Sequence, residues 1–258
     1  MGLVFAGTAR RSEAAQGLEF LPRCGRAACA SAHHNGPNDG GESSFDESNF
    51  DRCFEDLVAP FGGTEHHVPE DVFMLEVRCL EIPDIKIIQT GRVSDDRGYF
   101  CETFRRSAFA EKGILVDFVQ DNQSSSDKVG TVRGLHFQRP PFAQAKLIRV
   151  LSGAILDVVV DLRRSSATFG KHIAVKLDSK TGEQLFVPKG FAHGFCTLQP
   201  DTVVFYKVDQ VYAPSHDGGL YWADPALAIE WPVTTVEAKM SPKDRSLPRL
   251  DQLAAIFE

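Results

Sequence analysis

From Leu75 onward, hydrophobic and polar residues tend to alternate with a period of two, which is typical of β-strands. Residues 146–151 alternate in this way, and Gly153 marks the end of the strand. Residues 154–160 (AILDVVV) are apolar except for Asp157, as expected for a strand that is buried on both faces. Further short runs, separated by Gly, Pro, Asn or Asp, predict strands at residues 85–88, 118–120, 172–177, 184–187 and 203–208.

One helix is predicted within this β-rich pattern. Ser107 is of a residue type that caps helix N-termini, and Lys112-Gly113 is a typical helix end. Many short strands at regular spacing are typical of a sandwich or barrel, and not of alternating βαβ units. The predicted fold class is therefore all-β.

The first 73 residues lack this alternation and differ in composition. They contain five Arg and no Lys against twelve Asp and Glu, a net charge of −7, which leaves 23 basic and 23 acidic residues from Met74 onward. They contain no Ile, Tyr or Trp, and small polar residues dominate residues 31–48. Such a segment buries too little apolar surface to offset the entropy of ordering it. We therefore predict a disordered low-complexity extension over residues 1–73, with Met74 as the candidate true initiator, and one domain over residues 74–258.

Composition also excludes several classes of protein. Neither part of the chain has an excess of Lys and Arg, which argues against nucleic-acid binding. No apolar run approaches the ~20 residues of a membrane-spanning helix. The six cysteines are scattered without a C-x-x-C pair, and no signal peptide is recognisable, so we expect free thiols and a cytoplasmic location.

Two segments carry motifs with candidate chemistry. The first is GTVRGLHFQ at residues 130–138, and the second is GEQLFVPKGFAHGF at residues 182–195. The second has the spacing Gly, five residues, Pro, one residue, Gly, two residues, His, which ends at His193. Together they resemble the paired motifs of the cupin superfamily, and this resemblance implies a double-stranded β-helix of the jelly-roll type.

The residues of the first motif argue against a metal centre. Metal-binding cupins carry His-x-His followed by Glu in the first motif and a further His in the second. Here His136 and His193 remain, Gln138 stands in place of the second His, and residues 141–143 offer no carboxylate. Two ligands are fewer than a catalytic metal normally takes from protein, so we expect no metal and no cofactor.

Further motifs follow one another in order between Met74 and Leu253. They are DRGYF (96–100), FVQDN (118–122), RGLHFQ (133–138), KLIR (146–149), PKGFAHGF (188–195), YK (206–207), WAD (222–224), IEWP (229–232) and SPKD (241–244). This ordered series resembles the dTDP-4-dehydrorhamnose 3,5-epimerase family, in which the extension before Met74 has no counterpart. The resemblance implies conversion of dTDP-4-dehydro-6-deoxy-D-glucose to dTDP-4-dehydro-L-rhamnose, and a homodimer in which subunits share β-strands.

The implied reaction removes a proton beside a ketone and returns one from the opposite face. Its base needs a pKa near neutrality, which favours His. By resemblance, His136 is this base, Asp244 orients it, Lys146 stabilises the enolate oxygen and Tyr206 is the acid. The resemblance also places Arg97 and Arg133 against the diphosphate or sugar, Glu102, Gln120, Asn122 and His193 along the same pocket, and Tyr212 near it.

Three other functions stay open at this stage. A 3-epimerase or 5-epimerase of a related deoxysugar shares the same residues and differs in how many carbons exchange with solvent. A non-enzymatic sugar-nucleotide-binding cupin would bind without exchange, and the intact set of His136, Lys146, Tyr206 and Asp244 argues against it. A metal-dependent cupin oxygenase or isomerase would contain stoichiometric metal, and Gln138 argues against it.

Overall fold

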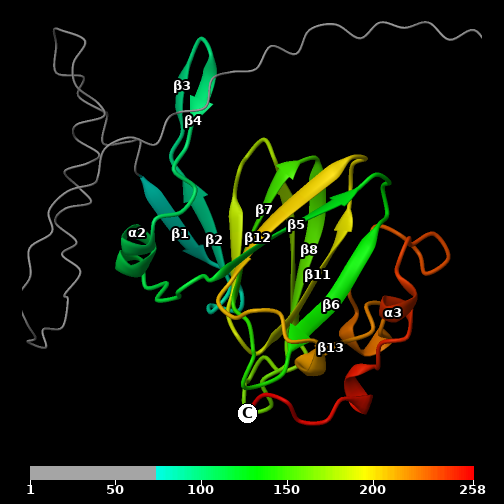
Figure 1. Ribbon diagram of the computed structural model, residues 1–258. Helices are drawn as coiled ribbons and strands as arrows, with labels where there is room; N and C mark the ends of the chain where they lie inside the picture. The colour runs from blue at the N-terminus through cyan, green and yellow to red at the C-terminus, as the bar shows by residue number, and fades with distance from the viewer. Residues whose placement is uncertain (1–73) are drawn as a thin grey trace, which may run out of the picture. The chain divides into compact units, whose positions relative to one another are not determined.

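Two antiparallel β-sheets that face each other form the framework of residues 74–258, the part of the chain that this computed structural model describes (Figure 1). The extension predicted over residues 1–73, with Cys24, Cys29 and Cys53, lies outside the described residues. The predicted all-β fold is confirmed.

The larger sheet has six strands in the order β1-β2-β10-β7-β12-β5. These strands are β1 (Leu75–Cys79), β2 (Lys86–Thr90), β10 (Gln184–Val187), β7 (Lys146–Ser152), β12 (Thr202–Val208) and β5 (Gln120–Ser126). The second sheet has five strands, β13 (Asp217–Gly219), β6 (Val132–Gln138), β11 (Phe191–Thr197), β8 (Ala154–Asp161) and β9 (His172–Asp178), in that order.

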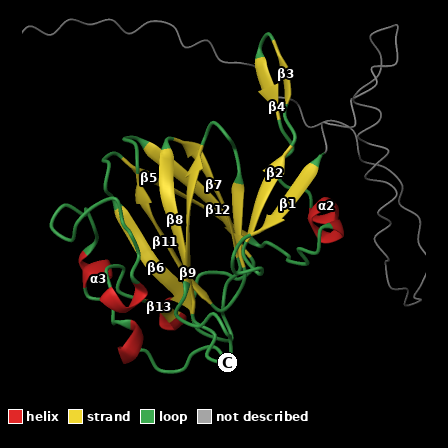
Figure 2. Ribbon diagram, turned by 180° about the vertical axis from the view of Figure 1, so that it is seen from behind, coloured by secondary structure: helices red, strands yellow, loops and turns green. Residues whose placement is uncertain are grey.

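The remaining elements are short. A hairpin of β3 (Val93–Asp95) and β4 (Gly98–Phe100) extends away from both sheets (Figure 1). The view from behind shows helix α2 (Arg106–Glu111) beside β1 and β2, and helix α3 (Pro242–Arg245) beside β6 on the other side of the fold (Figure 2). Three 3-10 helices follow β12, namely Pro214–His216, Pro225–Leu227 and Leu250–Gln252.

Hydrophobic cores on both sides of each sheet explain the apolar runs of the sequence. Ile148, Ile155 and Leu185 belong to the core between the sheets. The outer face of the five-stranded sheet packs against the C-terminal segment, where Val158 and Phe257 share a cluster. Because β8 is covered on both faces, its AILDVVV sequence is nearly continuous in apolar residues, as predicted.

Two details of the predicted elements are wrong. Helix α2 begins at Arg106 with Arg105 as its N-cap, and the Ser107 hydroxyl accepts a hydrogen bond from Arg105 Nη1 at 3.4 Å instead of capping the helix. The strand predicted at residues 118–120 is β5, which runs from Gln120 to Ser126. Its sequence QDNQSSS has no apolar residue, because its inward side faces a polar cavity. The other six predicted strands match β2, β7, β8, β9, β10 and β12 within about two residues at each end.

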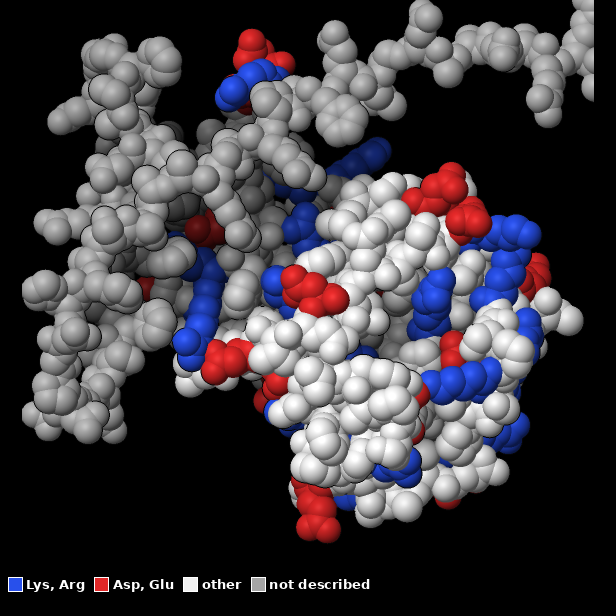
Figure 3. Space-filling view, viewed as in Figure 1, with Lys and Arg blue, Asp and Glu red and all other residues white. Residues whose placement is uncertain are grey.

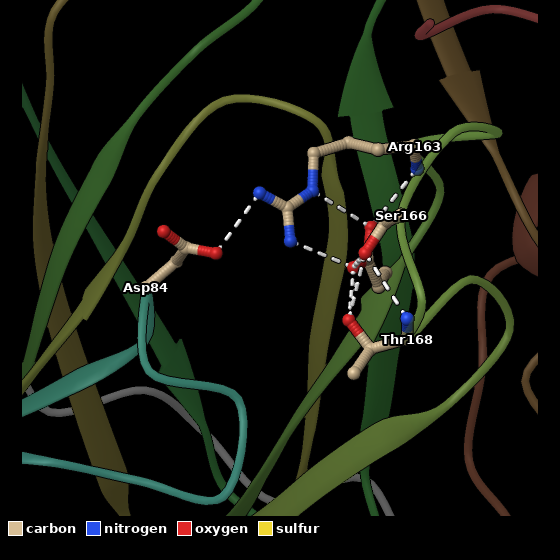
Figure 4. Close-up of polar contacts among 5 residues, drawn as sticks. Asp84, Arg163, Ser166 and Thr168 are labelled. Carbon is tan, nitrogen blue, oxygen red and sulfur yellow. Dashed lines mark hydrogen bonds and ion pairs between the residues drawn. The ribbon is translucent and has the colours of Figure 1, made fainter.

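A buried carboxylate fixes the loop that follows β8 (Figure 4). Asp161 is fully buried and accepts hydrogen bonds from Arg163 Nε, Ser166 Oγ and Thr168 Oγ1 at 2.6–2.9 Å. Arg163 also reaches Asp84 at 3.0 Å, which ties this loop to the segment before β2. Burial raises the pKa of Asp161, but these hydrogen bonds outweigh it and hold the pKa at about 2.

The helices and the surface charges bear on binding to a membrane or to a charged partner. No helix within residues 74–258 is long and apolar enough to cross a bilayer. Lys and Arg side chains lie interspersed with Asp and Glu (Figure 3). In the same part of the chain Cys79, Cys101 and Cys196 are free thiols, as predicted for these three.

Candidate active site

Two cavities lie at the inner faces of β5, β6, β7, β11 and β12, and they share His136, Lys146, Tyr206 and Lys243. The first, which we call the Tyr212 cavity, has a volume of about 370 Å³ and is also lined by Gln120, Asn122, Tyr212 and Asp217. The second, the Ser124 cavity, has a volume of about 290 Å³. Its further lining includes Ser124, Arg133, His193, Ser241 and Asp244.

A β-bulge brings Arg133 and His136 to the same side of β6. His136 pairs with His193 and Arg133 pairs with Phe195, so three steps along β6 oppose two along β11. The extra residue breaks the alternation of side chains that a regular strand would have. Both strands carry glycine here, because a Cβ on Gly134 would lie 2.6 Å from the Cα of Gly194. The pair of glycines thus lets the bulge form at the centre of the site.

His136 is hydrogen-bonded to Asp244, 108 residues further along the chain. His136 Nε2 lies 2.8 Å from Asp244 Oδ1, and the amide of Gly134 donates to the other carboxylate oxygen at 3.4 Å. Burial raises the pKa of Asp244, but the hydrogen bond and charge of His136 and the amide bond together outweigh it, so this pKa lies below its ordinary value. The carboxylate is therefore ionised at neutral pH and available to stabilise an imidazolium.

The local sequence Ser-Pro-Lys-Asp positions Asp244. Ser241 caps helix α3 by accepting a hydrogen bond from the Asp244 amide at 3.1 Å, and Pro242 occupies the first turn. Asp244 lies in the same first turn, where the helix dipole favours a carboxylate. This short capped turn places the buried carboxylate of Asp244 against β6.

Lys146 enters the site from the start of β7. Its side chain is buried, and Nζ donates to the carbonyl oxygen of His136 at 3.3 Å. Burial lowers the pKa of Lys146 to about 8, against the opposing charges of Asp157 and Asp217. The ammonium is thus present at neutral pH. Because it is poorly solvated, a negative charge that forms next to it is strongly stabilised.

Tyr206 lies on β12, opposite Asn122 of β5, and lines both cavities. Burial raises the pKa of Tyr206, while the charge of Arg133 opposes the shift. The phenol therefore keeps its proton over the physiological pH range, as a proton donor must.

A second histidine–carboxylate pair lies beside the first. His193 Nε2 is 2.9 Å from Asp157 Oδ1, and both residues are buried. His193 is also the strand neighbour of His136. Since Asp157 occupies one ring nitrogen, His193 is held in a fixed orientation at the wall of the Ser124 cavity.

Gln138 stands where metal-binding cupins carry a ligand, and its amide is fully engaged with protein. Its Nε2 donates to the carbonyls of Phe142 and Val211 at 2.8 and 3.2 Å, and its Oε1 accepts from the Ala213 amide. These bonds hold the loop that carries Tyr212. No group of three or more His, Cys, Asp or Glu side chains in residues 74–258 is placed to hold a metal ion.

The other predicted binding residues divide into two groups. Gln120 donates to Asn122 Oδ1 at 2.9 Å and accepts from the Tyr212 amide at 3.1 Å, so all three border the Tyr212 cavity. Arg97 and Glu102 line neither cavity within this chain. Arg97 is exposed on the projecting hairpin, where it pairs with Asp95, and Glu102 pairs with Arg105 at 2.9 Å.

Sequence reasoning missed Lys243 and Asp217. The Lys243 ammonium pairs with the Asp217 carboxylate, which also accepts from the Tyr212 hydroxyl at 3.0 Å. Asp217 raises the pKa of Lys243, so this side chain is a cation in both cavities. Its place directly before Asp244 in the SPKD motif was the signal that could have identified it.

The fold and site define a cupin-type jelly roll whose cavity combines a histidine–carboxylate pair, a buried lysine and a partly buried phenol. Such a set can remove a proton, stabilise the resulting anion and return a proton. The profile of the dTDP-4-dehydrorhamnose 3,5-epimerase family matches residues 79–252. The chain belongs to this family, whose activity is that of an isomerase.

Individual relatives agree with this assignment. The dTDP-4-dehydrorhamnose 3,5-epimerase of Sinorhizobium fredii is 48% identical over 197 residues, which cover 76% of this chain and 97% of that protein. The crystal structure of the Bacillus anthracis enzyme with TDP and PPi bound is 48% identical, with a TM-score of 0.66 over 68% of this chain and 99% of that one. A Legionella pneumophila structure in complex with dTDP-4-keto-L-rhamnose is 39% identical, with a TM-score of 0.67 over 70% of this chain and 96% of that one.

Proposed function

We propose that this protein converts dTDP-4-dehydro-6-deoxy-D-glucose to dTDP-4-dehydro-L-rhamnose by inverting C3 and C5, in the biosynthesis of dTDP-L-rhamnose. The observation that carries the proposal is the 2.8 Å pair of His136 and Asp244 in a cavity shared with Lys146 and Tyr206. Membership of the family supports the same reaction.

His136 is the base in this proposal. A carboxylate can only accept hydrogen bonds, so the ring nitrogen facing Asp244 carries the proton and Nδ1 carries the lone pair. Nδ1 removes the proton at C3 or C5, and the ring becomes an imidazolium that the ionised Asp244 stabilises.

The electrons released from the C–H bond move into the ketone and form an enolate with its charge on O4. The Lys146 ammonium, buried and beside His136, is the cation that stabilises this oxygen. Tyr206 returns a proton to the carbon from the opposite face, which inverts the centre. Before the second carbon reacts, the imidazolium gives its proton to solvent and the phenolate takes one from solvent, which restores the neutral base and the acid.

The nucleotide diphosphate is bound at the Tyr212 cavity in this proposal. Lys243 supplies a cation for the diphosphate, and Gln120 and Asn122 supply amide groups. Arg133 lies in the adjoining Ser124 cavity, where its guanidinium faces the sugar in this proposal. Tyr212 is exposed at the rim, where its ring can stack on the base. His193, fixed by Asp157, contacts the sugar from the wall of the Ser124 cavity.

We also propose a homodimer that completes the site. The β3–β4 hairpin extends from the fold and exposes 57% of Tyr99 and 64% of Phe100, which are large apolar surfaces for a monomer to leave in water (Figure 1). The same hairpin carries Arg97, and Glu102 follows it. In a dimer the hairpin of one subunit would bring Arg97 and Glu102 to the substrate of its partner. Light scattering should give twice the chain mass, and a monomer would contradict the proposal.

The catalytic domain spans residues 74–258 in this proposal, works in the cytoplasm and needs no metal. The family match at residues 79–252 supports the boundary. The test is proton NMR in D2O with the full chain, treated with a chelator, and dTDP-4-dehydro-6-deoxy-D-glucose. Loss of both the H3 and H5 signals supports a 3,5-epimerase. Loss of one signal shows a single-centre epimerase, and no loss with nucleotide bound shows a binding cupin.

A further inference from the structure

The Ser124 hydroxyl is a buried donor that the free protein leaves unused. Among residues 74–258, Ser124 Oγ is the one buried side-chain nitrogen or oxygen without a hydrogen-bond partner. Buried polar atoms are nearly always paired, because an unpaired one loses its bonds to water without replacement. Ser124 is such an exception, and it lines a cavity with acid–base groups, which suggests that its partner is a bound ligand.

The position of Ser124 on β5 directs it toward the reacting groups. Gln120, Asn122, Ser124 and Ser126 occupy alternate positions and share the inner face of the strand. Ser124 pairs with Val204 of β12, two residues before Tyr206, and Arg133 Nε is anchored to Ser126 Oγ at 3.2 Å. Ser124 thus lies on an edge strand that contacts both Arg133 and β12, the strand of Tyr206.

The two cavities indicate which part of a substrate would meet this hydroxyl. Ser124 lines the cavity that contains Asp244 and His193, together with the shared His136 and Tyr206. Gln120, Asn122 and Tyr212 border the other cavity and not this one. Gln120, Asn122 and Tyr212, which are proposed to bind the nucleotide, therefore line a different cavity from Ser124.

We propose that Ser124 donates a hydrogen bond to an oxygen of the sugar ring, next to the carbons that react, and so positions the ring between His136 and Tyr206. The inference rests on the proposed function and adds a substrate contact to it. Because the bond forms only with bound sugar, Ser124 should contribute to reaction and to sugar binding and contribute nothing to the stability of the free protein.

The test compares Ser124→Ala with Ser152→Ala, a matched change at an exposed serine at the end of β7. We expect Ser124→Ala to lower kcat/KM for H3 and H5 exchange by about 10- to 100-fold, the loss typical of one hydrogen bond to a substrate. The affinity for dTDP alone should stay within twofold, while that for dTDP-D-glucose should fall. The unfolding temperature should stay unchanged or rise. Ser152→Ala should match the wild type throughout.

Two results would overturn the inference. If kcat/KM and the dTDP-D-glucose affinity of Ser124→Ala stay within twofold of the wild type, the hydroxyl makes no bond to the sugar. If the unfolding temperature and dTDP affinity fall together, the role is structural. The binding measurements also separate this inference from the proposed function. A wild-type protein that exchanges neither H3 nor H5 refutes the proposed function, while the ratio of the affinities for dTDP and dTDP-D-glucose still tests Ser124.

Discussion

Replacing Asp244 by Asn tests how much the carboxylate contributes to proton abstraction. The change keeps the size of the side chain and an oxygen that can accept from Nε2, but it removes the charge that faces the imidazolium. Two unit charges 2.8 Å apart interact by about 6 kcal/mol at an effective dielectric constant of about 20. Because 34% of the His136 side chain is exposed, water screens the pair, and we take about half of that energy, about 3 kcal/mol.

An energy of about 3 kcal/mol corresponds to a rate loss of about 10²-fold, and the comparable change in a Ser-His-Asp triad costs ~10⁴-fold. We therefore expect Asp244→Asn to lower kcat for exchange at both carbons by a factor within about 10²–10⁴. The assay is the initial rate of H3 and H5 loss in D2O, with Asp251→Asn, at an exposed aspartate in the nearby 3-10 helix, as the matched control. A folded Asp244→Asn variant within about threefold of the wild type would refute the reasoning.

Three further predictions follow from the other buried groups. The pKa of Lys146 is lowered to about 8, and its ammonium is the form proposed to stabilise the enolate, so kcat/KM should fall as the pH rises through about 8. Lys146→Arg should move this fall to higher pH, and an unchanged profile would contradict the role of Lys146. Tyr206→Phe should impair inversion more than the first proton removal, so solvent deuterium would enter without complete inversion; full activity at both carbons would exclude Tyr206 as the acid. Asp161→Asn breaks the buried contacts to Arg163, Ser166 and Thr168 and should lower the free energy of unfolding by about 3 kcal/mol and the unfolding temperature by about 6–12 °C. The pKa of Asp161 is about 2 in the folded protein, below the unfolded value of about 3.9. The stability that Asp161 contributes is therefore complete above about pH 4 and is lost as the pH falls toward 2. Acid titration of the wild type and Asp161→Asn, followed by circular dichroism, checks this.

The sequence predicted the fold well where strands bury apolar side chains. Residues 154–160 are apolar because both faces of β8 are covered, and that pattern is visible without a structure. The extent of strand β5 could not be predicted in the same way, because its inner residues face a cavity and its sequence is entirely polar. The bulge at Gly134 was equally hidden, since a regular period of two places Arg133 and His136 on opposite faces.

The candidate site was accessible from the sequence only in part. His136 and Lys146 are unusual in otherwise apolar strands, so their chemistry is plausible from the residues themselves. Asp244 is one of 35 acidic residues and lies 108 positions from His136, and only family resemblance pointed to it. Ser124 emerges only from three-dimensional contacts, through its missing partner. Lys243 had a sequence signal in the SPKD motif, but its pairing with Asp217 is visible only in the structure.

Deuterium counting with the wild type and His136→Ala tests the central claim most directly, because one imidazole is proposed to serve both carbons. Each protein, shown to be folded by its unfolding temperature, is incubated with dTDP-4-dehydro-6-deoxy-D-glucose in D2O, and the product is examined by proton NMR and mass spectrometry. We predict deuterium at both C3 and C5 with the wild type, and at neither carbon with His136→Ala. Exchange at either carbon at a near wild-type rate in His136→Ala would contradict the account, because another base would then be at work.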